Sequence, residues 1–224
     1  MMMSLFSMFD PTAMLMIQLN WINMILNLIL LPPLFWTSMT RTQLIMNFTL
    51  KMLNSEFTSL FSKKILFKGS TLIMLALFSF IILNNLMSNF PYTFCCSAHI
   101  AFSSSLAIPI WLSIIIFCWV NLSKTMFSHL VPSGTPPILM PVMVMIELTS
   151  NLIRPMALAV RLSANLIAGH LLMALLGNTF LINSTYWPLI CVSQTLFLLF
   201  ELMVAMIQAY VFSVLMTLYS SEIS

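Results

Sequence analysis

The sequence predicts an all-α, polytopic helical membrane protein that forms a single membrane domain over residues 1–224. Of these residues 61% are hydrophobic and only 6% are charged, and the mean hydropathy is +1.05. A water-soluble domain needs more polar side chains than this chain has to cover its surface, whereas lipid needs no such cover. Several apolar stretches also reach the ~20 residues of one membrane crossing. We therefore expect about five membrane-embedded helices and one amphipathic surface helix.

The first three membrane-embedded helices are expected over residues 13–31, 70–90 and 97–120. Prolines mark the ends of two of them, because the sequence continues with Pro32-Pro33 and Pro91. Pro109 falls inside the third, where a neighbouring helix can accommodate a kink.

Residues 41–66 differ from these stretches and predict the amphipathic helix on the membrane surface. Apolar side chains recur there near helical spacing, while charged and amide side chains interrupt any continuous apolar run. Five of the eight basic residues lie between Arg41 and Lys68. By the positive-inside rule this loop faces the compartment in which the chain is made, the amino terminus lies on the opposite side, and Lys124 lies inside again.

The last two apolar stretches, 137–177 and 186–219, are too long for upright helices. Helices of these lengths extend about 60 Å and about 50 Å, against a hydrocarbon core of about 30 Å. We expect a strongly tilted hairpin, bent near Pro155.

Polar residues follow these two helices at regular spacing. Successive members of each series are seven positions apart. At this spacing each side chain is rotated by only about 20° around the helix from the previous one. The series in the first long helix is Glu147, Arg154 and Arg161, with Asn165 one turn further on; the series in the second is Gln194, Glu201 and Gln208. His170 lies nine residues after Arg161, on roughly the opposite face, and can form a titratable pair with Glu201 of the facing helix.

These side chains have two interpretations. They can join the helices as buried pairs, above all Glu147 with Arg154, or they can carry protons. Glutamate and histidine exchange protons, whereas arginine stays charged and acts as a barrier to protons and an attractor of carboxylates. Arg161 has no carboxylate within four residues, so we expect its anion to come from another chain.

Other chemistries have little support in the sequence. The four cysteines, Cys95, Cys96, Cys118 and Cys191, have no zinc or redox spacing and are interpreted as apolar filler. The three histidines form no HExxH or HxxxH motif, and there is no basic cluster with interleaved aromatics that would indicate nucleic-acid binding. No metal, no cofactor and no cleavable presequence are expected.

The run IELTSNLIRPMALAVRLSANLIAGHLLM, together with ELMVAMIQAYVFSVL and HLVPSGTPPILMPVMVMIE, strongly resembles subunit a of rotary ATP synthases in its mitochondrially encoded form. The stretches MFDP and NLMSNFPYTF resemble the invertebrate members. This resemblance implies a non-catalytic stator that couples proton flow to ATP synthesis through two offset aqueous half-channels beside a rotating ring of c subunits.

The resemblance also implies roles for individual residues. Arg161 would be the essential charge barrier, His170 and Glu201 the proton path from the intermembrane space, and Glu147 the path to the matrix. Asn165, Gln208, Arg154 and Gln194 would be supporting polar positions.

Peripheral-stalk subunit b, small membrane subunits and membrane lipid would be further partners. The chain would lie in the mitochondrial inner membrane, with its amino terminus in the intermembrane space and its carboxyl terminus in the matrix. The alternatives are a membrane subunit of another proton-coupled carrier or respiratory complex, for which internal repeats are expected but not found, and a structural anchor.

Overall fold

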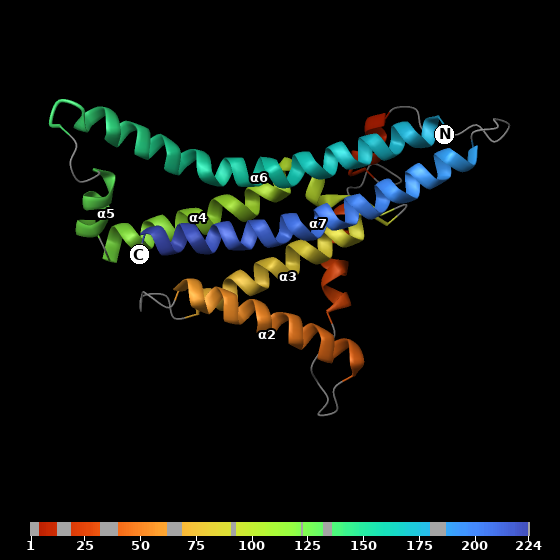
Figure 1. The fold of residues 1–224 in the computed structure, drawn as a ribbon, viewed down its shortest axis with the longest axis horizontal. Helices are drawn as coiled ribbons and strands as arrows, with labels where there is room; N and C mark the ends of the chain where they lie inside the picture. Colours follow the sequence, from red (N-terminus) through yellow and green to blue (C-terminus); the bar gives the residue numbers. More distant parts are fainter. Residues whose placement is uncertain are drawn as a thin grey trace.

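The computed structural model describes residues 5–12, 19–31, 40–61, 69–90, 93–121, 123–131, 136–179 and 187–223, and these residues form helices and no strand. The all-α prediction is therefore confirmed for this part of the chain (Figure 1). The main helices are α2 (Arg41–Phe61), α3 (Ser70–Ser88), α4 (Ile100–Asn121), α5 (Ser123–Leu130), α6 (Met140–Asn178) and α7 (Trp187–Ile223). Four of them, α3, α4, α6 and α7, are long and apolar enough to cross a membrane.

The amino-terminal part differs from the single helix expected over residues 13–31. Residues 13–18 lie outside the described part, and the chain then forms η3 (Leu19–Trp21), α1 (Ile22–Leu26) and η4 (Asn27–Leu30), after a short η1 (Leu5–Phe9). The reason is visible at one residue. The Asn27 Nδ2 donates a hydrogen bond of 2.9 Å to Asn84 Oδ1 of α3, and both side chains are buried. A buried amide needs such a partner, so this end of the segment packs against α3.

The two long carboxyl-terminal helices form the expected antiparallel pair (Figure 1). At 39 and 37 residues they extend about 58 Å and about 56 Å. Helix α6 begins at Met140 rather than at 137, because Pro137–Leu139 form a turn. Pro155 lies buried inside α6 and cannot donate a backbone hydrogen bond there, and α6 curves along its length (Figure 1). The connection at 180–186 lies outside the described residues.

A row of small side chains lets α7 approach α3 closely. Ala205, Ala209, Ser213 and Thr217 are spaced four apart along α7 and are all buried. The Ser213 and Thr217 hydroxyls donate to carbonyls of their own helix, at 2.9 and 2.7 Å, and so need no partner on another helix. Small residues at this spacing are typical of close helix packing in membranes. The elements α3 and α7, and likewise α4 and α6, accordingly pack side by side.

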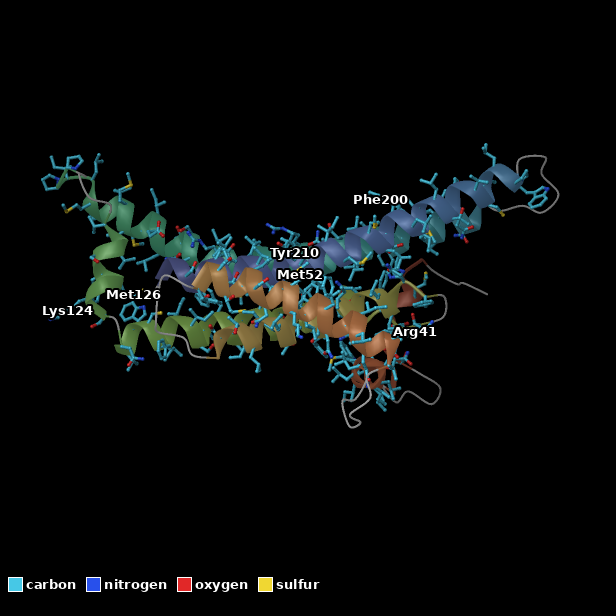
Figure 2. All side chains as sticks on the ribbon, turned by 60° about the horizontal axis from the view of Figure 1, so that its bottom comes forward. Arg41, Met52, Lys124, Met126, Phe200 and Tyr210 are labelled. Carbon is cyan, nitrogen blue, oxygen red and sulfur yellow. The ribbon has the colours of Figure 1, made fainter. Side chains whose placement is uncertain are left out.

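Helix α2 packs along α3 and α7 and keeps an apolar face outside the chain. Phe57 is fully buried against the core, whereas Leu44, Phe48 and Met52 are exposed. The Tyr210 hydroxyl of α7 donates a hydrogen bond of 3.3 Å to Glu56 Oε2, which ties the two helices together (Figure 2). The apolar stripe read from the sequence therefore has two uses. Its end packs on the protein, and its first turns remain available to lipid.

The chain segment between α4 and α6 contains an element that the sequence analysis missed. Helix α5 (Ser123–Leu130) joins the far end of α4 to the beginning of α6, and it stands between those two helix ends (Figure 1). Its eight residues make about two turns, which is too few for a recognisable helical spacing of apolar side chains. It was therefore found only from the structure, where it packs against α4 and α6.

Candidate functional site

A glutamate and a histidine meet between α6 and α7. The Nε2 of His170 lies 4.0 Å from Oε1 of Glu201. Glu201 is 6% exposed, although the helix around it is almost entirely apolar. The ring of Phe9 packs edge-on against His170, with 6.3 Å between ring centroids. The structure thus brings together the two side chains that were paired across the hairpin from the sequence.

Gly169 makes room for this pair. A Cβ built on Gly169 would lie 2.7 Å from Cδ of Glu201, and it would lie closer still to Oε1. Any side chain at position 169 would therefore push the carboxyl group out of its place. The carboxyl sits directly against the backbone of α6 because that residue is glycine.

Buried polar atoms continue from this pair toward α3 and the segment after it. Within the described residues, seven buried side-chain atoms have no hydrogen-bond partner in the protein: Asn85 Oδ1, Asn89 Oδ1, Asn89 Nδ2, Ser97 Oγ, His99 Nε2, His170 Nε2 and Glu201 Oε1. Folded proteins satisfy such atoms with ordered water when the protein itself does not. Together they favour a hydrated region rather than a dry apolar core.

The thiol of Cys95 shows that these groups are neighbours. Burial raises the pKa of Cys95, and the Glu201 carboxylate raises it further. Hydrogen bonds with the side chain of Ser88 and with the backbone of Ala98 act in the opposite direction. On the other side, Asn85 Nδ2 donates a hydrogen bond of 3.4 Å to the carbonyl of Ala205, one turn beyond Glu201. We call Asn85, Ser88, Asn89, Ser97 and His99 the polar cluster.

The sequence analysis missed the polar cluster. It took residues 70–90 as an apolar span and gave His99 no function. A signal was present, because Asn84 and Ser88, and likewise Asn85 and Asn89, are four apart within an otherwise apolar helix. Such a stripe at membrane depth indicates a polar contact or a water-lined path. The ring of His99 packs against those of Trp21 and Phe94, at 5.2 and 5.3 Å between centroids, and these two rings also contact each other at 5.8 Å.

Arg161 lies on a different face of α6. Its neighbours Leu162 and Ser163 are buried, whereas Arg161 itself is exposed. In the part of the chain that the structure describes, its guanidinium makes no hydrogen bond and no ion pair. Asn165, one turn further along, is half-buried. Among the described residues, Arg161 therefore has no anionic partner. That its anion comes from another chain stays a prediction.

Glu147 and Arg154 do not pair with each other. Both are half-buried, and among the described residues the Glu147 carboxylate has neither a hydrogen bond nor an ion pair. The Arg154 guanidinium lies over the ring of Tyr219 on α7, 5.2 Å from its centroid. The two charges therefore form no direct ion pair, and the cation is turned toward an aromatic face of the other helix. That they neutralise each other across two helical turns stays a prediction.

The two glutamines of α7, Gln194 and Gln208, are half-buried on either side of Glu201. Neither shows a side-chain hydrogen bond among the described residues. Besides these glutamines, the other six polar positions of the two long helices fall into three groups. One is the His170–Glu201 pair, a second is the exposed Arg161 with Asn165, and a third is Glu147 with Arg154 near the start of α6. No group of three metal-binding side chains occurs in the described residues.

Comparisons with known proteins give matches to a single protein family. The family model of the ATP synthase A chain matches residues 14–221. "ATP synthase subunit a" of Anopheles gambiae is 49% identical over 227 residues, that of Locusta migratoria is 48% identical over 225 residues, and that of Drosophila melanogaster is 47% identical over 225 residues. Each of these matches covers 100% of both chains.

Proposed function

The chain belongs to the ATP synthase A chain family, and from this premise we propose that it moves protons through the membrane sector of that enzyme by two offset half-channels. It is a non-catalytic membrane subunit of the complex. In the proposed arrangement it is a stator in the mitochondrial inner membrane, beside a rotating ring of c subunits that each carry a carboxylate. Peripheral-stalk subunit b and small membrane subunits hold it in place.

The exposed Arg161 is the observation that carries this proposal. A permanent cation on the outer face of an apolar helix costs free energy at membrane depth unless an anion pairs with it. No described group of the same chain does so. A carboxylate of a neighbouring c subunit has the opposite charge and would lie at the same depth in the membrane as Arg161. Because arginine keeps its proton, it attracts that carboxylate and repels mobile protons.

The His170–Glu201 pair and the polar cluster form the proposed path from the intermembrane space. Both members of the pair can take up and release protons, and the buried polar atoms around them favour water between the groups. A proton passes along this path and neutralises a ring carboxylate, which can then enter lipid.

Glu147 forms the proposed path to the matrix. The supporting polar positions are Asn165, Gln208, Arg154 and Gln194. On the far side of Arg161 the ring carboxylate meets water and the cation, ionises, and releases its proton past Glu147. Because the two paths are offset, a proton crosses only when the ring turns. A potential of 100 mV supplies about 2.3 kcal/mol per charge, so several protons are needed for each ATP.

Replacing Arg161 tests the proposal. In the assembled enzyme, Arg161→Ala should abolish ATP synthesis and ATP-driven proton pumping while allowing passive proton leak. Arg161→Lys should also fail in coupled work but leak less, because an ammonium retains charge without the planar guanidinium. Glu201→Gln is the matched control, since it removes proton exchange and should slow passive flow without creating a leak.

The measurement is proton flux into energised membranes whose catalytic sector has been removed, with and without a reagent that blocks the ring carboxylate. A fully assembled Arg161→Ala enzyme that makes ATP at the normal rate would contradict the proposal. So would a leak in Glu201→Gln as large as that in Arg161→Ala.

A further inference from the structure

An apolar hollow lies where α4, α5 and α6 meet, away from the polar groups described above. Its volume is about 310 Å³. The residues that line it are Trp111, Ile115, Trp119, Ser123, Met126, Phe127, Leu130, Leu148, Asn151 and Leu152. Figure 2 shows Met126 on α5 at this end of the molecule. The lining contains two polar side chains and no charged one, so the hollow suits a hydrocarbon occupant.

The walls of the hollow form a groove rather than a closed cavity. Trp111, Ile115 and Trp119 are four apart and follow one stripe of α4 for about 12 Å. Leu148 and Leu152 of α6 form the facing wall, and both are exposed. The groove is therefore open to the outside of the chain, and its walls α4 and α6 are both long and apolar enough to cross a membrane.

Lys124 stands at the end of this groove. It directly follows the lining residue Ser123 and is exposed, and Figure 2 shows it at the outer edge of α5. It is the one charged residue between positions 100 and 146 of the sequence. Trp119 of the groove packs edge-on against Phe127 of α5, with 5.6 Å between the ring centroids. A tryptophan and a lysine at the end of an apolar helix are typical of the level of the lipid head groups.

We propose that this groove binds one acyl chain of an anionic phospholipid, whose phosphate lies at Lys124. An apolar hollow of this size stays dry, because water finds too few polar partners there. An empty one would forfeit the dispersion contacts of its lining. A lipid chain is the hydrocarbon that the bilayer always supplies. The bound lipid fills the space beneath α5 and holds that short helix against α4 and α6.

Photoactivatable phosphatidylglycerol, with the reactive group on its acyl chain, tests this proposal in the assembled enzyme reconstituted in membranes. Mass spectrometry of peptides should find the label concentrated on residues 111–130. Ile115→Trp fills the groove and should lower that label at least fivefold. Ile116→Trp is the matched control, because Ile116 is the next residue of α4, is exposed and does not line the groove.

The charge is tested separately. Lys124→Gln should lower the preference for phosphatidylglycerol over phosphatidylcholine about fivefold, which is the effect of one basic residue near an anionic lipid surface. Lys51→Gln, which changes an exposed lysine of α2, should leave that preference unchanged. Three results would overturn the proposal: equal labelling in the two isoleucine variants, label spread evenly over α4, α6 and α7, or a partner polypeptide that covers the groove and excludes the lipid. None of these results depends on proton transport.

Discussion

Gly169 shows how one missing side chain sets the geometry of the proposed proton path. The backbone of α6 at this position contacts the carboxyl group of Glu201, which is held beside His170. A glutamate of this size could not be buried against a helix with any larger residue at the contact. The glycine is thus a positioning residue for two groups that carry the chemistry.

We expect Gly169→Ala to slow proton flow through the assembled membrane sector roughly tenfold. This is less than the roughly 10²–10⁴-fold contribution of a positioned acid–base group, because the carboxyl is displaced rather than removed. Alanine favours the helix at this position, so assembly should persist. Gly177→Ala is the matched control on the same helix, since nothing lies within 4 Å of a Cβ there. Passive proton flux and subunit content of both variants provide the measurement. Equal flux in the two variants would contradict the assigned role.

Within α7, two kinds of side chain meet different neighbours. The small residues Ala205, Ala209, Ser213 and Thr217 are buried, as are the larger Phe212 and Met216. Other large residues of this helix, such as Leu199 and Met203, are exposed. In a bilayer the exposed residues meet lipid tails, which are as apolar as leucine, so shape rather than hydrophobicity drives the packing of α7 on α3. The residues that decide this packing are therefore the smallest ones.

Enlarging one of these small residues should separate α7 from α3. Ala209→Leu adds three heavy atoms to a site with no exposed surface, and overpacking of this kind costs about 1–3 kcal/mol. Ala76→Leu adds the same atoms at an exposed position of α3 and should be tolerated. The amount of chain retained in the membrane, and its thermal unfolding in detergent, should fall for the first variant only. A normal Ala209→Leu variant would show that this contact is looser than the structure indicates.

At the scale of the whole molecule, the placement of the charges predicts orientation. Arg41 and Lys51 on α2 and Lys124 on α5 are exposed, and two apolar helices, α3 and α4, separate the two groups. An even number of crossings puts α2 and α5 on the same side, which the positive-inside rule makes the matrix. Helix α6 then carries the chain across, so that its end at Thr179 faces the intermembrane space.

Cysteines introduced one at a time test this orientation. Lys51→Cys and Lys124→Cys should react with a membrane-impermeant maleimide only from the matrix side, and Thr179→Cys only from the intermembrane space. Labelling of residues 124 and 179 from one side would refute the proposed topology. The native Cys95 and Cys96 should stay unlabelled, because both are buried and burial raises the pKa of Cys96 to about 11. At neutral pH this leaves about one thiol in ten thousand as the reactive thiolate.

The sequence by itself determined the class of the protein and most of its long elements. So little charge excludes a soluble surface, and apolar runs longer than a bilayer is thick predict the long helices α6 and α7. It also predicted candidate functional residues along those helices, because a heptad spacing of polar side chains stands out in an apolar helix. The pairing of His170 with Glu201 followed from the antiparallel hairpin that the two runs imply.

Only the tertiary structure decided contacts between segments that are far apart in the chain. The place of Gly169 against Glu201, the turn of Arg154 toward Tyr219, and the meeting of Asn27 with Asn84 all join different helices. The sequence did contain the polar stripe of α3, but nothing local distinguishes an amide that lines a path from one that joins two helices. Periodicity reports which face of a helix a residue occupies, whereas the identity of the neighbour across that face is a property of the packed molecule.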